Sequence, residues 1–299
     1  KTYSIKTTRT GKNFLNVTLT NKNGDVQCKV WDINDKTIED FNNEILIIKA
    51  TVNEYNGAKQ LIINNQKIPS EQIDISKLIQ SSKYDPNVML VEIKNTVEQF
   101  DNSQLKLIVN KLLEKYNDGL NIGGAKQNHH TYRNGLLEHT YSILQSAKSI
   151  AQRYGDNINK DLLFAGCIIH DLGKIKEYDV NRFGIVIENS MIGDLLGHIS
   201  IMVQDIGVVA NDLIRDGNKI DQKIITLLSH MVLSHHGCPE FGSPKFPMIK
   251  EAEILSNLDM IDAKMNMFDS AINSIDNNQF SQKQWALNNR KIYKGSTDI

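Results

Sequence analysis

Apolar and polar residues alternate through the first part of the chain, between positions 14 and 63. This alternation, with a period of two, is typical of β-strands that bury one face. Residues 15–19 and 26–30 alternate on either side of the turn-forming sequence Asn-Lys-Asn-Gly-Asp, which predicts a hairpin. With an isoleucine-rich run at 44–52 and another run at 60–63, about five short strands are expected. Such a set favours a small OB-type β-barrel over residues 1–68.

The alternation also assigns two faces to the predicted hairpin. The core face is expected to carry six apolar side chains, those of Leu15, Val17, Leu19, Val26, Cys28 and Val30. The opposite face then carries Phe14, Lys29 and Trp31, with Arg9 and Lys12 nearby. Exposed aromatic rings between cations suit a surface that stacks the bases of a single strand. The same two rings could instead pack against the second domain, and both interpretations stay open.

A helical spacing of apolar residues replaces the alternation in the rest of the chain. Residues 69–95 are expected to form a linker with one short helix, and an all-α domain is predicted over residues 96–275. Its expected helices cover residues 97–116, 136–154, 160–171, 193–215, 221–235 and 249–275. The polar residues 276–299 are expected to form a C-terminal tail. We therefore predict a multidomain β + α protein.

The composition, with 40% hydrophobic and 23% charged residues, is ordinary for a soluble globular protein of 299 residues. We expect a cytoplasmic protein without a membrane partner, because no run approaches roughly 18 apolar residues and no signal-peptide pattern opens the chain. The widely spaced Cys28, Cys167 and Cys238 are expected to be reduced thiols. A net charge of −1 argues against binding nucleic acid through bulk charge alone, although residues 1–70 carry 10 basic and 7 acidic side chains, a local charge of +3.

The sequence Cys-Ile-Ile-His-Asp-Leu-Gly-Lys at 167–174 carries the first candidate chemistry. Its adjacent His170 and Asp171 end an apolar run and offer a nitrogen and a carboxylate to one metal ion. Further candidates lie on or beside the predicted helices, namely His139, His198, His235 with His236, and Asp259 with Asp262. Each also has a structural interpretation when taken alone; Asp259, for example, could pair with Lys264.

Taken in order, these motifs resemble those of the HD-domain superfamily, whose helices gather His, His-Asp and a distant Asp around one or two divalent ions. Longer stretches resemble the YhaM family of 3′–5′ exoribonucleases, which joins an OB-fold to an HD domain. These stretches are His-His-Thr-Tyr-Arg-Asn-Gly-Leu-Leu-Glu-His at 129–139, His-His-Gly at 235–237, Gly-Ser-Pro-Lys at 242–245 and Asp-Met-Ile-Asp-Ala-Lys at 259–264. The resemblance covers nearly the whole chain.

Two departures from the family pattern bear on the expected structure. Thr131 and Asn134 stand where smaller residues are expected, which would alter the rim of a pocket without touching a ligand. The chain begins at Lys1 and runs almost at once into a strand-like segment. We therefore expect the first strand of the family's barrel to be absent or shortened here.

The resemblance implies a first metal site whose ligands are His139, His170, Asp171 and Asp259. Asp171 is the natural bridge between two ions, since a carboxylate has one oxygen for each. A second ion would be held by His198 and by His235 or His236; we favour His235 as the ligand and His236 as a catalytic neighbour that contacts the substrate. Imidazole and carboxylate ligands suit one or two ions of Mn²⁺, with Fe, Ni or Mg as alternatives, better than they suit Ca²⁺.

Lys174 resembles the lysine that the superfamily places beside its metal centre. There it would hold a phosphate oxygen or assist the leaving group. It could also be a lysine at a helix end that complements the helix dipole. The role of Asp262 stays open in the same way, because it either supports a ligand or is an ordinary surface carboxylate.

Four polar residues precede the first metal helix in a stretch that matches the family. Of these, His130, Tyr132 and Arg133 are expected to hold an incoming phosphate or ribose, and Arg133 is the best candidate for the phosphate. For His130, and for the preceding His129, a structural role is an equal alternative.

The resemblance implies an exonuclease that shortens single-stranded RNA from its 3′ end and releases nucleoside 5′-monophosphates. An HD phosphohydrolase of nucleotides or cyclic dinucleotides is the alternative among enzymes, and the strand-binding module argues against it. A single-strand-binding protein with an inactive HD site is the alternative outside enzymes, and the intact ligand set argues against that. The sequence leaves open the cleavage of single-stranded DNA and the formation of a homo-oligomer.

Overall fold

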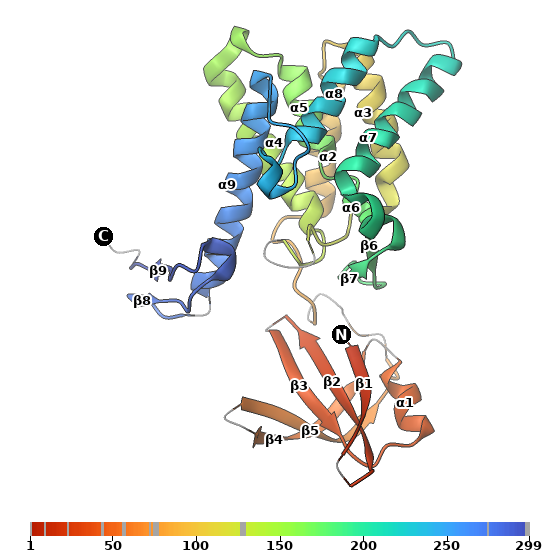
Figure 1. Ribbon diagram of the computed structural model, residues 1–299, viewed down its shortest axis with the longest axis vertical. Coiled ribbons are helices and arrows are strands. Elements are labelled where there is room, and N and C mark those ends of the chain that lie inside the picture. Colours follow the sequence, from red (N-terminus) through yellow and green to blue (C-terminus); the bar gives the residue numbers. More distant parts are fainter. Residues whose placement is uncertain are drawn as a thin grey trace. The chain divides into compact units, whose positions relative to one another are not determined.

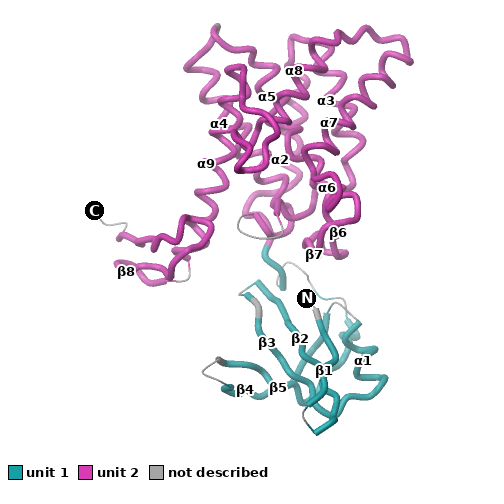
Figure 2. The backbone as a smooth tube through the Cα atoms, viewed as in Figure 1, with its two compact units in different colours: residues 1–80 teal, residues 81–299 magenta. Residues whose placement is uncertain are grey.

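The computed structural model of the chain describes residues 2–8, 10–22, 24–42, 45–55, 58–71, 73, 78–125, 130–273 and 275–296. The chain divides into two compact units, residues 1–80 and residues 81–299 (Figure 2). A β-sheet forms the first unit and helices form most of the second (Figure 1). The predicted order of a β module before an α module is therefore confirmed.

The first unit is built on one five-stranded sheet. Its strands are β1 (Thr2–Thr7), β2 (Asn13–Asn21), β3 (Gly24–Val30), β4 (Ile47–Tyr55) and β5 (Ala58–Lys67). They lie in the order β1-β2-β3-β5-β4, and every neighbouring pair is antiparallel except β3 with β5. The predicted hairpin is confirmed as β2 and β3, in a register that places Leu15 opposite Val30 and Val17 opposite Cys28.

The core of the sheet follows the predicted alternation. Leu15, Val17, Cys28 and Val30 are at most 4% exposed, and Leu19 and Val26 pack against them. The short helix α1 (Asp35–Phe41), which the alternation did not predict, adds Phe41 to this core. This helix begins at Asn34, whose side chain accepts the backbone N–H of Thr37 at 2.8 Å.

The predicted closure of the sheet into a barrel was wrong for the described strands. Among them, β1 pairs only with β2 and β4 only with β5, so the sheet keeps two edges. Strand β4 is exposed along most of its length, and its Val52 is 71% exposed. Alternation specifies which face of a strand is buried, but it does not specify which edges pair. Strand β1 pairs with β2 over its whole length.

Eight α-helices are described in the second unit. They are α2 (Pro86–Glu98), α3 (Ser103–Tyr116), α4 (Gly135–Tyr154), α5 (Lys160–Ile169), α6 (Lys174–Glu177), α7 (Met191–Arg215), α8 (Gln222–Ser234) and α9 (Lys250–Asn273). Two short hairpins that the sequence did not predict accompany them, β6 (Tyr178–Val180) with β7 (Val186–Asn189) and β8 (Gln279–Phe280) with β9 (Tyr293–Lys294). The predicted all-α character of this unit is otherwise confirmed.

Helix α2 begins inside the segment that we expected to be a linker. Its Met89 and Ile93 are at most 1% exposed and belong to the helical core. The described part of residues 69–85 contains no helix, and residues 72 and 74–77 of the predicted linker lie outside the described residues. Asn102 ends the break between α2 and α3, because its side chain accepts two backbone N–H groups at the start of α3.

Helix α5 lies in the centre of the helical core and carries the His-Asp pair at its end. Asn159 caps its first turn, and Leu163, Ile168 and Ile169 are fully buried. Gly166 allows α8 to approach closely, since a Cβ there would lie 2.4 Å from a side-chain carbon of Met231. The position of His170 and Asp171 is therefore fixed by the packing of the whole core.

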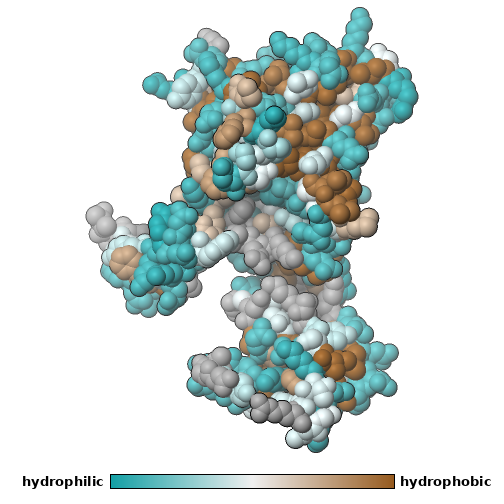
Figure 3. Space-filling view, in the orientation of Figure 1, coloured by the Kyte–Doolittle hydropathy of each residue, from teal (hydrophilic) through white to brown (hydrophobic). Residues whose placement is uncertain are grey.

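Helix α7 is the one described helix whose length and hydropathy would allow it to span a membrane. Its backbone breaks at Gly197, where φ is 68°, and the part that follows contributes Met202 and Ile206 to the core. Apolar side chains stay exposed on the helical unit (Figure 3), including Met191 and Leu195 in the first part of α7. Core packing accounts for the apolar composition of the second part of the helix.

Candidate metal centre

The carboxylate of Asp171 lies at the centre of a group of histidines. Three imidazoles approach it through Nε2: His139 at 3.3 Å and His170 at 3.5 Å from Oδ2, and His198 at 3.5 Å from Oδ1. The Nε2 atom of His235 is 3.6 Å from Oδ1. The sequence-predicted ligands from α4, the end of α5, α7 and the end of α8 are thus brought together.

The Nδ1 atom of each of these imidazoles is held by an acceptor outside the centre. His170 donates to the carbonyl of Cys167 at 3.0 Å, and His235 donates to the carbonyl of Val232 at 2.7 Å. Both residues stand directly after a helix, where the last carbonyls have no partner within the helix. These bonds fix the tautomers so that both Nε2 lone pairs face Asp171, as a metal ligand requires.

Carboxylates orient the other two imidazoles in the same sense. His139 donates from Nδ1 to Asp262 at 2.7 Å, and His198 donates from Nδ1 to Glu177 at 3.1 Å. The same Glu177 oxygen accepts the backbone N–H of His198 at 3.0 Å. Sequence reasoning left the role of Asp262 open and did not identify Glu177. Glu177 contacts His198 directly after the break of α7 at Gly197, and its role depends on how the chain folds back between these two positions.

Buried polar atoms without partners mark the place that an ion would fill. Among the described residues, Oδ1 of Asp171 and Nε2 of both His198 and His235 are buried and accept or donate no hydrogen bond. Unpaired buried polar atoms are costly, and a cation between them would satisfy all three. The donor set of imidazole nitrogens and carboxylate oxygens fits a divalent ion.

The carboxylates around His139 stabilise the protonated form of its imidazole. Asp259 lies with Oδ1 at 3.2 Å from Nε2 of His139. Burial opposes an imidazolium, but hydrogen bonds with Asp171, Asp259 and Asp262 outweigh it and raise the pKa of His139 well above its ordinary value. By contrast, burial lowers the pKa values of His170 and His235, which keeps them neutral and ready to act as ligands.

Lys174 is an integral part of the centre. Its Nζ lies 2.7 Å from Oδ2 of Asp171, and its side chain is only 8% exposed. Burial would raise the pKa of Asp171, but the Lys174 ammonium and the neighbouring imidazoles hold it well below its usual range. Lys174 lies in the single turn of the four-residue helix α6, and its ammonium is engaged by Asp171.

His236 lies beside the centre, and one of its ring nitrogens lies within 4.8 Å of ligand atoms of His198 and His235. Its ring centroid is 4.1 Å from that of His235 and 5.4 Å from that of His198. Burial, together with the nearby His235, lowers the pKa of His236 to about 3, so the ring is neutral. Its backbone N–H donates to the hydroxyl of Ser243 at 3.0 Å, and its Nδ1 has no partner among the described residues.

The residues before α4 divide into a buried and a more exposed set. His130 is 3% exposed, and its ring nitrogens lie 2.9 Å from the Tyr132 hydroxyl and 2.8 Å from Asp262. This placement does not fit the direct contact with a substrate that we predicted, because the imidazole is enclosed and engaged at both nitrogens. Tyr132 and Arg133 are partly exposed. His129 lies outside the described residues.

The predicted aromatic surface of the first unit is present. The rings of Phe14 and Trp31 are 4.7 Å apart between centroids, and Trp31 is 41% exposed. The Nζ atom of Lys29 lies 5.7 Å from the Phe14 ring, 5.8 Å from the Trp31 ring and 4.8 Å from a third ring, that of Tyr55. Sequence reasoning missed Tyr55, which β4 carries at its last position with 60% exposure.

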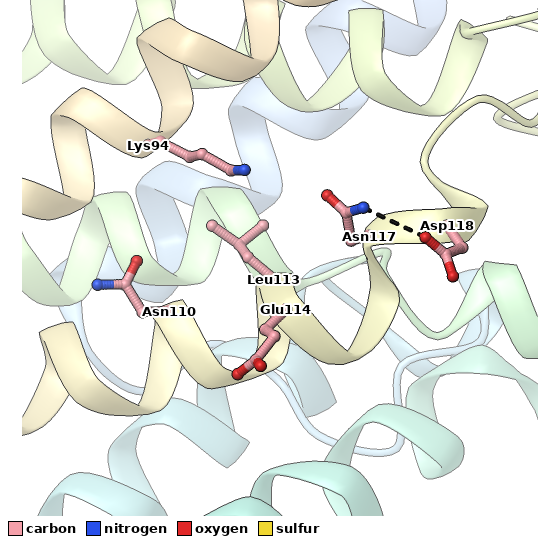
Figure 4. A pocket seen from close by; sticks show the side chains of 6 residues that line it. All are labelled: Lys94, Asn110, Leu113, Glu114, Asn117 and Asp118. Atoms are coloured by element: carbon pink, nitrogen blue, oxygen red, sulfur yellow. Dashed lines mark hydrogen bonds between the residues drawn. The ribbon is translucent and has the colours of Figure 1, made fainter.

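A separate cavity of about 370 Å³ lies in the second unit against α3 (Figure 4). Its lining consists of Lys94, Asn110, Leu113, Glu114, Asn117 and Asp118. None of these residues belongs to the histidine cluster. The carboxylate of Glu114 pairs with Lys111 at 2.7 Å. The cavity gathers no group with an altered reactivity, and we assign it no function.

Comparison with known proteins agrees with this geometry. The HD domain family matches residues 136–264, which include every candidate ligand, and HD domains bind divalent metal ions. The chain is 36% identical over 289 residues to the 3′–5′ exoribonuclease YhaM of Bacillus licheniformis, a match that covers 95% of this chain and 89% of that protein. No solved structure gives a significant match to the chain.

Replacing Asp262 tests the orientation of His139. Asp262→Asn should weaken Mn²⁺ binding by roughly 10–100-fold, because the amide is a poorer acceptor for Nδ1–H and releases the ring from its inward orientation. Isothermal titration of Mn²⁺ into protein stripped of metal measures the change. Asp269→Asn, an exposed carboxylate on the same helix, is the matched control and should bind as the unmodified protein does. Equal affinity in the two variants would return Asp262 to the role of an ordinary surface carboxylate.

Proposed function

Because the chain belongs to the YhaM family of 3′–5′ exoribonucleases, we propose that it is a metal-dependent phosphodiesterase that shortens single-stranded RNA from the 3′ end to nucleoside 5′-monophosphates. The observation that carries this proposal is the set of four imidazoles, each fixed at Nδ1 from outside and directed through Nε2 at Asp171. The 3′ direction and the preference for RNA rest on the relative's activity. Single-stranded DNA, with the same phosphodiester, is a candidate second substrate.

We assign the ligands in two groups that share Asp171. The first group consists of His139, His170, Asp171 and Asp259. The second consists of His198 and His235 with the other oxygen of Asp171. The Nε2 atom of His235 lies 3.6 Å from that oxygen, which supports choosing His235 over His236. When bound, divalent ions supply an activated water and positive charge for the phosphate oxygens. Mn²⁺ suits these ligands best, with Fe, Ni and Mg as alternatives, while the lack of thiolate ligands argues against a structural zinc site.

The remaining residues of the centre act on charge and position. Lys174 neutralises Asp171 and offers its ammonium to the negative charge that develops as the phosphodiester breaks. His236, being neutral and adjacent to His235, can donate or accept one hydrogen bond to the substrate. Arg133 and Tyr132 are the candidates for contacts to the incoming phosphate or ribose. We now assign His130 to supporting Asp262.

We assign residues 1–68 to an OB-type module for single strands and residues 96–275, extended to include α2, to the catalytic module. The strand order of the sheet, with one parallel pair, is compatible with a partly open Greek-key barrel. Three aromatic rings, those of Phe14, Trp31 and Tyr55, surround the Lys29 ammonium. Such a surface can stack on the bases of a single strand whatever their sequence. This surface favours a polynucleotide over the nucleotides or cyclic dinucleotides of the alternative hydrolase, since a small substrate needs no strand-binding surface.

The product pattern tests the activity. Incubation of 5′-labelled single-stranded RNA with the protein and Mn²⁺ should give a ladder that shortens progressively from full length, whereas an endonuclease would give one internal cut. Asp171→Asn should abolish the ladder, because the shared carboxylate loses its charge and one of its metal-binding oxygens. Circular dichroism shows whether the variant is folded. A folded variant that turns RNA over normally would contradict the metal assignment.

Lys174→Met should lower kcat by roughly 10²–10³ while the Mn²⁺ content is preserved, since one donor to transition-state charge is lost and the side-chain volume is kept. Lys176→Met is the matched control, because Lys176 lies on the same short helix and pairs at 2.5 Å with Asp205 instead. Single-turnover kinetics with both variants measures the chemical step. Equal rates for the two would exclude Lys174 from the reaction.

Trp31→Ala should weaken binding to a 20-nucleotide RNA by about tenfold and leave hydrolysis of a three-nucleotide RNA nearly unchanged, since one base stack is worth about 1–3 kcal/mol. Val52→Ala, a highly exposed apolar residue of the same sheet, serves as the control. Fluorescence anisotropy measures the affinity and calorimetry the melting temperature. A lower melting temperature with unchanged RNA affinity would support the alternative in which Trp31 packs against the second domain.

A further inference from the structure

Residues 275–296 form a folded appendage at the end of α9 (Figure 1), where a C-terminal tail over residues 276–299 was expected. Its hairpin places Phe280 opposite Tyr293, and a 3₁₀ turn follows at Trp285–Leu287. Leu287 and Ile292 are buried in a small core with Ala271 of α9. The segment therefore has a defined fold of its own, anchored to the helix that precedes it.

The largest side chains of the appendage are not used in this core. Trp285 is 79% exposed, Phe280 62% and Tyr293 51%. The rings of Phe280 and Tyr293 lie 5.0 Å apart between centroids, side by side on the hairpin. An exposed pair of aromatic rings, with a third exposed ring on the same short segment, is typical of a surface that binds a partner.

The charge of the appendage identifies the kind of partner. Lys283, Arg290, Lys291 and Lys294 oppose the single acid Asp276, so residues 275–296 carry a net charge of +3. No carboxylate among the described residues pairs with any of these cations. Lys294 and Arg290 donate to backbone carbonyls, and Arg290 also lies 5.8 Å from the Phe268 ring. A second copy of the same surface would be repelled by this charge, whereas a polyanion with stacking bases would be attracted.

The location of the appendage relates it to the metal centre. Helix α9 carries Asp259 and Asp262 in its middle and ends at Asn273, so 11 residues separate Asp262 from the end of the helix. At a rise of about 1.5 Å per residue this is roughly 16 Å. That length corresponds to about five stacked nucleotides at 3.4 Å each. A strand with its end at the metal centre and longer than this could reach the appendage.

We propose that residues 275–296 form a second binding surface for single-stranded RNA, one that holds the strand upstream of the scissile end; this rests on the proposed exonuclease activity. Phe280, Trp285 and Tyr293 stack on bases, and Lys283 and Lys291 contact phosphates. The surface has the same combination of rings and cations as the one around Lys29, on a different part of the chain. It contributes only to substrates longer than about five nucleotides.

Two variants test the proposal in the full chain. Trp285→Ala should lower kcat/KM for a 20-nucleotide oligouridylate by about tenfold and leave that for a three-nucleotide RNA unchanged. Its side chain is 79% exposed, so the fold should be preserved. The double variant Lys283→Gln/Lys291→Gln should reduce the slope of log affinity against log salt by about 1.4, since each phosphate contact on a single strand contributes about 0.7. Binding is measured by anisotropy with all proteins also carrying Asp171→Asn, which prevents cleavage.

The controls match each change elsewhere in the second unit. Tyr154→Ala removes an aromatic ring of 55% exposure at the end of α4, and Lys219→Gln/Lys223→Gln removes two exposed charges near the start of α8. Neither control should change the ratio of kcat/KM for the 20-nucleotide RNA to kcat/KM for the three-nucleotide RNA, or the salt dependence of binding.

Three outcomes would overturn the proposal. The first is unchanged cleavage and binding of the 20-nucleotide RNA by the appendage variants, with the unmodified protein active. The second is a change in sedimentation coefficient on Trp285→Ala, which would assign the surface to a second copy of the chain. The third is an unmodified protein that neither cleaves nor binds RNA, which would remove the proposed function as well. An unmodified protein that binds RNA without cleaving it would contradict the proposed function alone. The salt dependence of RNA binding by the lysine double variant would then still test whether the appendage binds the strand.

Discussion

The buried carboxylate of Asp171 is the constraint on which the catalytic unit depends. It is 2% exposed, and burial of an unpaired carboxylate would be strongly unfavourable. Its Oδ2 is held by Lys174 at 2.7 Å and approached by two imidazoles, while Oδ1 faces His198 and His235 without a hydrogen bond among the described residues. The hydrogen-bonding capacity of the carboxylate is therefore satisfied at Oδ2 but not at Oδ1. The pairing with Lys174 keeps the carboxylate ionised, and the unsatisfied side is what makes the centre a cation site.

Two of the four histidines are directed at Asp171 by ordinary features of helix ends. His170 and His235 each follow a helix and donate to a carbonyl three residues earlier, so the unpaired carbonyls at the ends of α5 and α8 select the tautomer. No additional acceptor is needed at these two positions. His139 lies within the first turns of α4, where its own helix has no unpaired carbonyl to offer, and a carboxylate from α9 takes that role. The choice between carbonyl and carboxylate therefore follows from where in its helix each histidine lies.

The sequence predicted the hairpin core and the residues that gather around Asp171, because the first depends on local periodicity and the second on matched motifs. Leu15 and Val30 are expected on the same face of the hairpin because the side chains of each strand alternate. His170 and Asp171 lie together because they are adjacent in the sequence. Glu177 could not be found in this way, because its contact with His198 requires two hairpin strands and a helix start to intervene. Asp262 was ambiguous for a related reason: position 262 is one helical turn from Asp259, but only the packing of α4 against α9 decides whether it meets a histidine. Barrel closure was predicted wrongly because strand periodicity contains no information about edge pairing.

Helix α9 joins the chemistry of the centre to the appendage that follows it. Its two ligand-side carboxylates, Asp259 and Asp262, are fixed by contacts to α4, and its far end is fixed by Leu287 and Ile292 packing on Ala271. Its 24 residues form one uninterrupted α-helix, which resists bending and keeps the metal centre and the appendage at a nearly constant spacing. A strand held at both places would be fixed in register with the scissile bond, since neither contact can move along the strand without the other. Residues far from the reacting phosphate can contribute to catalysis in this way, because binding energy from the strand is used to position the phosphate at the centre.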